Sequence, residues 1–283
     1  MRMEVAGMLL VFVKFVGMKV PNYLLIAIFV FIVGCSDFQK ALKSEEVKFK
    51  NDLALELYEQ GKYRKAAQLF VQLKEIYRGK PQAERIVFFY ANSLLNTRNY
   101  ILAAYEFETF IKAYPKSQKA EEAYFLMAYA HYNTSPNFSL DQTDTYEALD
   151  KIQEFINRYP ASERMAEANA MAKELREKTE KKGFETSKQY NTIRDYKAAL
   201  NSLDNFIADN PGTTYREGAL FVQFSAATTL AINSVAYKKQ KRLDDAKSKF
   251  ENFKRLYPNS EHMPDALKMM EDIEEEILTF ASN

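Results

Sequence analysis

Apolar positions along this chain recur at a spacing of four and then three residues, in a short pattern that appears five times. Each copy begins with an alanine, continues with apolar residues four and seven positions later, and in four copies ends at a proline. Positions with this spacing share one face of an α-helix, and proline ends a helix because it lacks an N–H. Each copy therefore predicts one packed helix and its exit turn. The copies begin at Ala66, Ala103, Ala148, Ala199 and Ala246.

A serine or threonine follows each of these prolines by two positions, and its side-chain oxygen predicts a cap for the next helix. Each copy is then the second helix of a hairpin. The pattern predicts helices at about 46–60, 63–77, 121–133, 164–190, 195–209, 214–236, 241–257 and 263–280, a further hairpin within 82–114, and a loop at 135–145.

The 164–190 stretch is rich in charged residues, which predicts a solvated helix with an apolar stripe. Glu174 and Lys178 are spaced for an i,i+4 ion pair, as are Glu177 and Lys181. Gly183 lies inside the stretch and predicts a break or bend in the helix.

A turn and a tyrosine precede the alanine in several copies, and this order resembles the tetratricopeptide (TPR) repeat. It occurs in GKYRKAAQLF at 61–70, RNYILAAYEF at 98–107 and RDYKAALNSL at 194–203. The copies lie farther apart than the TPR period of about 34 residues, which loop insertions explain. We predict an all-α, right-handed superhelix (solenoid) of about five TPR-like helical hairpins, closed by a C-terminal capping helix at 263–280.

Residues 1–34 have the pattern of a signal peptide. An apolar run at 23–33 follows Lys19 and is too short to span a bilayer as a helix. It ends in Ile-Val-Gly before Cys35, which resembles the lipobox of bacterial lipoproteins. That resemblance implies cleavage before Cys35, acylation of its sulfur and new amine, and a lipidated tether at 35–45. Ser36 in place of aspartate favours the outer membrane. The alternative is an uncleaved membrane anchor followed by a chance cysteine.

The segment from Met18 to Cys35 is by itself a complete lipoprotein signal, so either Met1 or Met18 is the start of the chain.

Composition narrows the function classes. The chain has 39 basic and 38 acidic residues, which disfavours nucleic acid as a partner. A single cysteine excludes an internal disulfide. The two histidines, His131 and His262, lie far apart without metal-like spacing, and no phosphate-binding or hydrolase motif is present. We therefore expect no enzyme activity, no cofactor and no metal.

Aromatic residues are abundant, with 18 tyrosines and 21 phenylalanines but no tryptophan. In TPR hairpins the first helix lines the concave side, where aromatic rings and amides suit an extended, partly apolar peptide. The alternative is that these rings simply pack between helices. The candidate peptide-binding residues are Tyr58, Phe88, Asn92, Phe125, Tyr129 and Tyr132.

A lipobox followed by five TPR-like hairpins resembles the BamD family, the lipoproteins of the outer-membrane β-barrel assembly (BAM) complex. Local matches are LYEQGKYRKAAQLFVQL at 57–73, DQTDTYEAL at 141–149 and REKTEKKGFETSKQYNTIRDYKAAL at 176–200. The resemblance implies a non-catalytic scaffold on the periplasmic face of the outer membrane. Repeats 1–3 would occupy 46–163, and repeats 4–5 with the capping helix would occupy 164–283.

The resemblance also implies two kinds of partner. C-terminal repeats of the family bind periplasmic domains of a BamA-like barrel insertase, and N-terminal repeats receive the C-terminal strand signal of unfolded outer-membrane proteins. Arg194 and Lys197 are our candidate insertase contacts. The runner-up is a TPR lipoprotein of another envelope complex, for cell-surface glycan binding or envelope organisation, although the lack of tryptophan counts against glycan binding.

Overall fold

The structure is a computed structural model that describes residues 37–281, and within this range every regular element is helical. The predicted all-α class and the helix positions are confirmed, with small shifts at the ends. The helices are α3 (Val47–Glu59), α4 (Tyr63–Ile76), α5 (Ala83–Asn96), α6 (Tyr100–Ala113), α7 (Ala120–Thr134), α8 (Thr143–Arg158), α9 (Met165–Thr192), α10 (Tyr196–Asp209), α11 (Arg216–Ile232), α12 (Ala236–Leu256) and α13 (Met263–Ala281). The predicted signal peptide lies outside the described residues.

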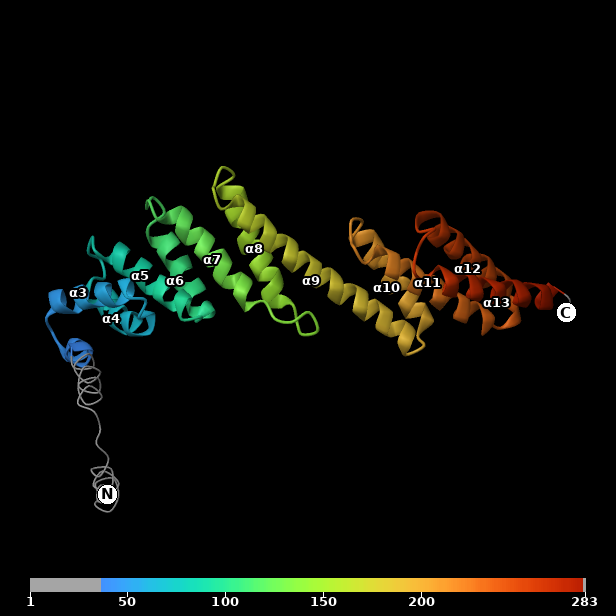
Figure 1. Ribbon diagram of the computed structural model, residues 1–283, viewed down its shortest axis with the longest axis horizontal. Helices are drawn as coiled ribbons and strands as arrows, with labels where there is room; N and C mark the ends of the chain where they lie inside the picture. The colour runs from blue at the N-terminus through green and yellow to red at the C-terminus, as the bar shows by residue number, and fades with distance from the viewer. Residues whose placement is uncertain (1–36, 282–283) are drawn as a thin grey trace, which may run out of the picture. The chain divides into compact units, whose positions relative to one another are not determined.

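The chain forms two compact units, one up to Tyr124 and one from Phe125 onward, so their division falls inside α7. The boundary between repeats 3 and 4 at 163/164 stays a prediction. In the N-terminal unit, α3 pairs with α4, α5 pairs with α6, and α4 also packs on α5 (Figure 1). In the C-terminal unit, each helix from α8 to α12 packs on the next. These neighbours are the antiparallel hairpins that the repeats predict.

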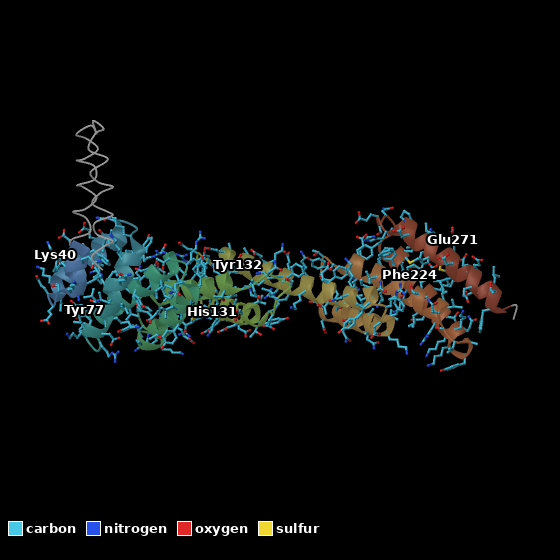
Figure 2. All side chains as sticks on the ribbon, turned by 90° about the horizontal axis from the view of Figure 1, so that it is seen from below. Lys40, Tyr77, His131, Tyr132, Phe224 and Glu271 are labelled. Atoms are coloured by element: carbon cyan, nitrogen blue, oxygen red, sulfur yellow. The ribbon has the colours of Figure 1, made fainter. Side chains whose placement is uncertain are left out.

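Helix α13 covers the end of the C-terminal unit, as expected for a capping helix. It packs against both α11 and α12. Its Ala266, Met270 and Ile273 join the core around the fully buried Phe224 of α11, which Figure 2 labels. The outward side of α13 carries acidic residues such as Glu271.

The exit turn of each hairpin has one recurring geometry. The tyrosine before the proline packs on the phenylalanine four residues earlier, with centroids 5.3 Å apart for Phe110–Tyr114 and 5.7 Å apart for Phe155–Tyr159. The Ser117 N–H donates to the Tyr114 carbonyl at 3.0 Å, and equivalent bonds form at Ser162, Thr213 and Ser260.

The predicted role of the hydroxyl residues needs correction. Ser117 Oγ accepts the Lys119 N–H at 2.9 Å, before α7 begins at Ala120. Ser162 Oγ likewise accepts the Arg164 N–H at 3.2 Å, while Arg164 itself is the N-cap residue of α9. The side chains therefore close the turn ahead of the helix and do not cap the helix itself.

Residues 37–43, expected as part of a polar tether, are helical and packed. Phe38 and Ala41 are buried, and the Lys65 ammonium of α4 lies 5.3 Å from the Phe38 ring centroid. The reason is that two apolar residues three positions apart share one face of a helical turn. Packing against the N-terminal unit thus extends to residues close to Cys35 in the sequence.

Gly183 does not break α9, which continues through it to Thr192. A Cβ atom at Gly183 would lie 3.1 Å from Cδ2 of Phe206 in α10, and one at Gly218 would lie 3.1 Å from Cζ of Phe184 in α9. These glycines therefore allow close approach of neighbouring helices. Tertiary contact, rather than backbone flexibility, explains their presence.

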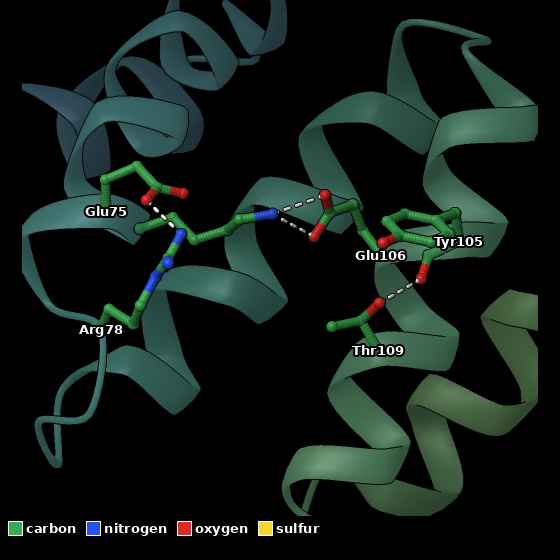
Figure 3. A network of polar contacts seen from close by, with 6 residues as sticks. Glu75, Arg78, Tyr105, Glu106 and Thr109 are labelled. Atoms are coloured by element: carbon green, nitrogen blue, oxygen red, sulfur yellow. Dashed lines mark hydrogen bonds and ion pairs between the residues drawn. The ribbon is translucent and has the colours of Figure 1, made fainter.

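A buried ion pair joins α4 to α6 in the N-terminal unit (Figure 3). The Lys74 ammonium donates to both Glu106 oxygens, at 2.6 and 2.8 Å. The Glu106 side chain is 4% exposed and the Lys74 side chain 25%. Lys74 also lies 5.3 Å from the Tyr90 ring of α5, so this contact ties three helices together.

Candidate interaction surfaces

A partly exposed aromatic cluster lies on the first helices of the N-terminal unit. The Tyr58 ring of α3 packs edge-on against Tyr63 at 5.3 Å and Phe89 at 4.8 Å. Burial, followed by the neighbouring Tyr63 and Glu122 charges, raises the pKa of Tyr58 to about 12. The Arg85 guanidinium lies 5.4 Å from the Phe89 ring. This cluster offers apolar surface beside a cation.

Phe88, the neighbouring candidate, belongs to the core. It is 5% exposed and packs against Phe107 and Phe110 of α6, at 6.0 and 5.5 Å. The half-buried Asn92 accepts a 2.8 Å hydrogen bond from Asn96 Nδ2. The residue that sequence reasoning missed is Phe89, since adjacent phenylalanines point in directions about 100° apart on a helix and the pattern did not say which one faces outward.

In the C-terminal unit, α7 carries a row of three rings at helical spacing. Phe125 is 2% exposed and packs edge-on against Phe155 of α8 at 5.4 Å, with the Arg164 guanidinium 4.5 Å from its ring. Tyr129 is half-buried and stacks on Phe125 at 6.4 Å and on Tyr132 at 6.3 Å. Two of the three rings are therefore accessible, and the third supports them from below.

Tyr132 is held in place by α9. Its hydroxyl donates a 2.6 Å hydrogen bond to Glu174 Oε2. This bond is the largest cause that raises the pKa of Tyr132 to about 12, followed by burial and by the charges of Glu174 and Tyr129. Because the folded-state pKa lies above the ordinary value of 10, the bond stabilises the fold below about pH 10 and is lost as pH rises through 12.

Glu174→Gln is expected to lower the pKa of Tyr132 toward its ordinary value, since an amide oxygen accepts the hydrogen bond without a charge. A ¹³C NMR titration of Tyr Cζ would measure the shift, with the Tyr132 signal assigned from Tyr132→Phe. Glu177→Gln, one turn along α9, should leave the midpoint in place. An unchanged midpoint in Glu174→Gln would show that burial alone sets this pKa.

The loop between α7 and α8 packs on α9 through the lysines of that helix. Lys178 Nζ donates to Ser135 Oγ at 2.8 Å, Lys182 Nζ donates to the Leu140 carbonyl, and Lys181 Nζ lies 4.3 Å from the Phe138 ring centroid. The two i,i+4 pairs predicted for this helix are wrong. The partners of Glu174 and Lys178 lie on α7 and the loop, and Glu177 pairs instead with Lys173, one turn earlier in α9, at 3.8 Å. The charged face of α9 is thus a docking face for the loop.

Two open cavities flank Phe138 in this region. One has a volume of about 380 Å³ and lies against Lys182, Lys188 and Gln189; the other has about 500 Å³ and lies against Glu174, Lys178 and Tyr215. Both cavities are lined by lysine and glutamate side chains as well as by the Phe138 ring. Such surfaces suit a polar peptide better than a small apolar ligand.

Arg194 and Lys197, the predicted partner contacts, are exposed at the turn from α9 to α10. Arg194 has a positive φ of 67°, and Asp195 caps α10 by accepting the Ala198 N–H at 3.1 Å. The adjacent Ile193 is 63% exposed. Arg194 therefore directly follows an exposed apolar residue, and Lys197 lies in the first turn of α10.

The turn from α11 to α12 has a similar character and lies at the same end of its hairpin as the α9–α10 turn (Figure 1). Val235 is 56% exposed and Tyr237 is 81% exposed. Basic residues of α12, including Lys238 and Lys241, follow directly. We call Ile193, Arg194, Lys197, Val235 and Tyr237 the C-terminal turn edge.

Both histidines pack against neighbours. His131 Nδ1 lies 3.8 Å from Glu147 Oε1, and the His262 ring stacks on Phe221 at 4.4 Å. Within residues 37–281, no group of three or more His, Cys, Asp or Glu side chains is arranged for a metal ion. None of the helices in that range combines the length and the apolar character needed to cross a bilayer.

Comparison with known proteins assigns the class. A family model described as outer membrane lipoprotein (YfiO) matches residues 51–243 and 195–279. Outer membrane protein assembly factor BamD of Caulobacter vibrioides is 23% identical over 212 residues, covering 72% of this chain and 68% of that protein. BamD of Haemophilus influenzae is 20% identical over 243 residues, covering 82% and 92%.

Among solved structures, a thermophilic TPR protein of Thermus thermophilus is similar at 15% identity with a TM-score of 0.31, covering 82% of this chain and 99% of that one. The antiparallel hairpins of the described residues define an all-helical repeat protein. This chain belongs to the outer membrane lipoprotein (YfiO) family.

Proposed function

We propose that this chain is a non-catalytic scaffold of the β-barrel assembly machinery, anchored by acylated Cys35 at the periplasmic face of the outer membrane. The observation that carries the proposal is the family match over most of the chain, together with relatives named as BamD. Because those relatives are only 20 to 23% identical, the proposed partner contacts rest on the surfaces of this chain itself.

Unfolded barrel proteins are the proposed clients of the first-helix aromatic surfaces. Tyr58 and Asn92 would contact a client in the N-terminal unit, and Tyr129 and Tyr132 in the C-terminal unit. Phe88 lies 6.3 Å from Phe89, and Phe125 stacks under Tyr129, so these buried rings would act by fixing the rings above them. Rings held by packing lose little side-chain entropy on binding, which favours recognition of aromatic side chains.

A BamA-like insertase is the proposed partner of the C-terminal turn edge. The edge combines exposed apolar residues with Arg194 and Lys197, and the start of α12 adds further basic residues. Apolar anchors with a polar rim are typical of protein interfaces, and the excess of basic over acidic side chains here favours an acidic partner surface.

The test is affinity purification from native envelopes in mild detergent, with a tag after Asn283 and mass spectrometry of co-purifying proteins. We expect near-stoichiometric recovery of a barrel protein with repeated periplasmic domains. Arg194→Glu/Lys197→Glu should reduce that recovery at least tenfold, whereas the matched pair Lys247→Glu/Lys268→Glu, exposed elsewhere in the same unit, should not. Recovery of a nutrient transporter or of cell-wall enzymes would instead support the alternative, a TPR lipoprotein of another envelope complex.

A further inference from the structure

A cavity of about 610 Å³ in the N-terminal unit is lined by basic residues. It lies where the α3–α4 turn meets the α5–α6 turn, two segments more than thirty residues apart in the chain. The cavity is lined by Gly61, Tyr63, Asn96 and Thr97 together with four cations, Lys62, Arg64, Lys65 and Arg98, and by no carboxylate.

These four cations have no acidic partner among the described residues. Lys62 Nζ donates to the amide oxygen of Gln60 at 2.7 Å, and Lys65 lies over the Phe38 ring. The helices α4 and α6 both begin beside the cavity without a side-chain cap and without an acidic residue in the first turn. The partial positive charge of the two helix ends adds to that of the side chains, so the cavity favours an anion.

A second cavity, of about 440 Å³, continues from the first and shares Arg64 and Thr97 with it. Its lining includes the apolar Ala67, Val71, Leu94 and Leu102, together with the polar Gln68, Tyr90 and Asn99. An open, cation-lined hollow thus adjoins a second open hollow that is lined by apolar and polar side chains. A ligand with an anionic head and an apolar body matches this arrangement.

The position of Cys35 relates this site to a membrane. Phe38 is in contact with Lys65 at the cavity, and Cys35 is three residues before Phe38. Three residues span at most about 11 Å. An acyl chain on Cys35 would therefore hold the lipid surface within that distance of the Phe38 backbone.

We propose that the cavity formed by the α3–α4 and α5–α6 turns binds the phosphate group of an anionic membrane phospholipid, with the lipid's apolar part against Val71 and Leu102. This inference rests on the proposed acylation of Cys35, which supplies the nearby bilayer. The site would fix the orientation of the N-terminal unit on the membrane, which a flexible acyl anchor cannot do alone.

The test uses the acylated protein purified from envelopes in dodecyl maltoside and titrated with short-chain lipids below their micelle concentration. Dihexanoyl-phosphatidylglycerol is the anionic probe, dihexanoyl-phosphatidylcholine the zwitterionic one, and inorganic phosphate the free anion. We expect the phosphatidylglycerol affinity to exceed the other two by at least about tenfold. Arg64→Gln/Arg98→Gln should reduce it by about tenfold or more, since each cation near an anionic lipid contributes to binding.

The matched control is Lys116→Gln with Lys268→Gln, which removes two exposed charges that do not line either cavity and should leave the affinity unchanged. Equal affinity for both lipids, or an equal loss in the control, would overturn the proposal. So would tight binding of inorganic phosphate alone, which would indicate a free-anion site. Competition by a peptide with a free C-terminal carboxylate, but not by its amide, would show a client site instead.

Recovery of the insertase is measured separately and does not depend on this titration. Lipid binding can therefore fail while the scaffold function stands, and the reverse also holds.

Discussion

Replacing Cys35 with serine is expected to abolish incorporation of labelled palmitate and to remove the protein from the outer-membrane fraction. The diacylglyceryl group expected on Cys35 is joined to its sulfur by a thioether bond and so requires the sulfur, and each buried methylene of its acyl chains contributes about 0.8 kcal/mol to membrane affinity. Three chains hold a protein far more firmly than one, whose binding is marginal and reversible. The measurement is palmitate labelling of whole cells followed by separation of inner and outer membranes.

Ser36→Ala is the matched control, because it changes the neighbouring residue and keeps the sulfur. It should retain both the label and the outer-membrane position. Continued labelling of Cys35→Ser, or its unchanged recovery with the outer membrane, would contradict acylation at this position and favour the alternative of an uncleaved anchor.

Replacing Lys74 with methionine is expected to destabilise the contact between α4 and α6 by about 3 kcal/mol, because removing one partner leaves a buried charge without compensation. Glu106 keeps its carboxylate in a site where its side chain is 4% exposed. Repeat proteins can unfold one group of repeats at a time, so a single free energy of unfolding for the whole chain would not report this local contact. Hydrogen exchange by mass spectrometry should instead show about a hundredfold loss of protection in α4 and α6.

The exposed pair Lys112–Glu108 on α6, at 3.2 Å, provides the control. Lys112→Met should change protection by less than about threefold, since exposed ion pairs contribute little. The double variant Lys74→Met/Glu106→Leu should recover most of the loss, because it removes the buried charge as well. If Lys74→Met exchanged like the wild type, the ion pair would not secure these helices.

Cys35→Ser tests the attachment of the protein to the membrane, whereas Lys74→Met tests the packing of helices within the N-terminal unit. The N-terminal unit is proposed to meet lipid at its basic cavity and clients at Tyr58, and both surfaces depend on the α3–α6 hairpins keeping their relative positions. Loosening α4 against α6 through Lys74 should therefore weaken lipid binding without affecting acylation.

Much of the fold follows from local sequence. The alanine and phenylalanine spacing is a property of single helices, and the Tyr-Pro turn depends on residues within a few positions of one another, so both were readable from the sequence alone. The same holds for the apolar run before Cys35, the family resemblance and the absence of a strong net charge. Where local predictions were wrong, the difference was small: Ser162, predicted to cap α9, closes the turn two residues before the N-cap residue Arg164.

Only the tertiary structure decided which side chains meet. Phe88 and Phe89 are equivalent in sequence, but the packing of α5 on α6 buries the first and leaves the second partly open. Glu174 and Lys178 of α9 were expected to pair with each other, yet Glu174 accepts from Tyr132 of α7 and Lys178 donates to Ser135 of the following loop. The Lys74–Glu106 pair and the basic cavity each join segments about thirty residues apart. Helical periodicity determines the faces of a helix, whereas the rotation and placement of neighbouring hairpins determine what covers each face.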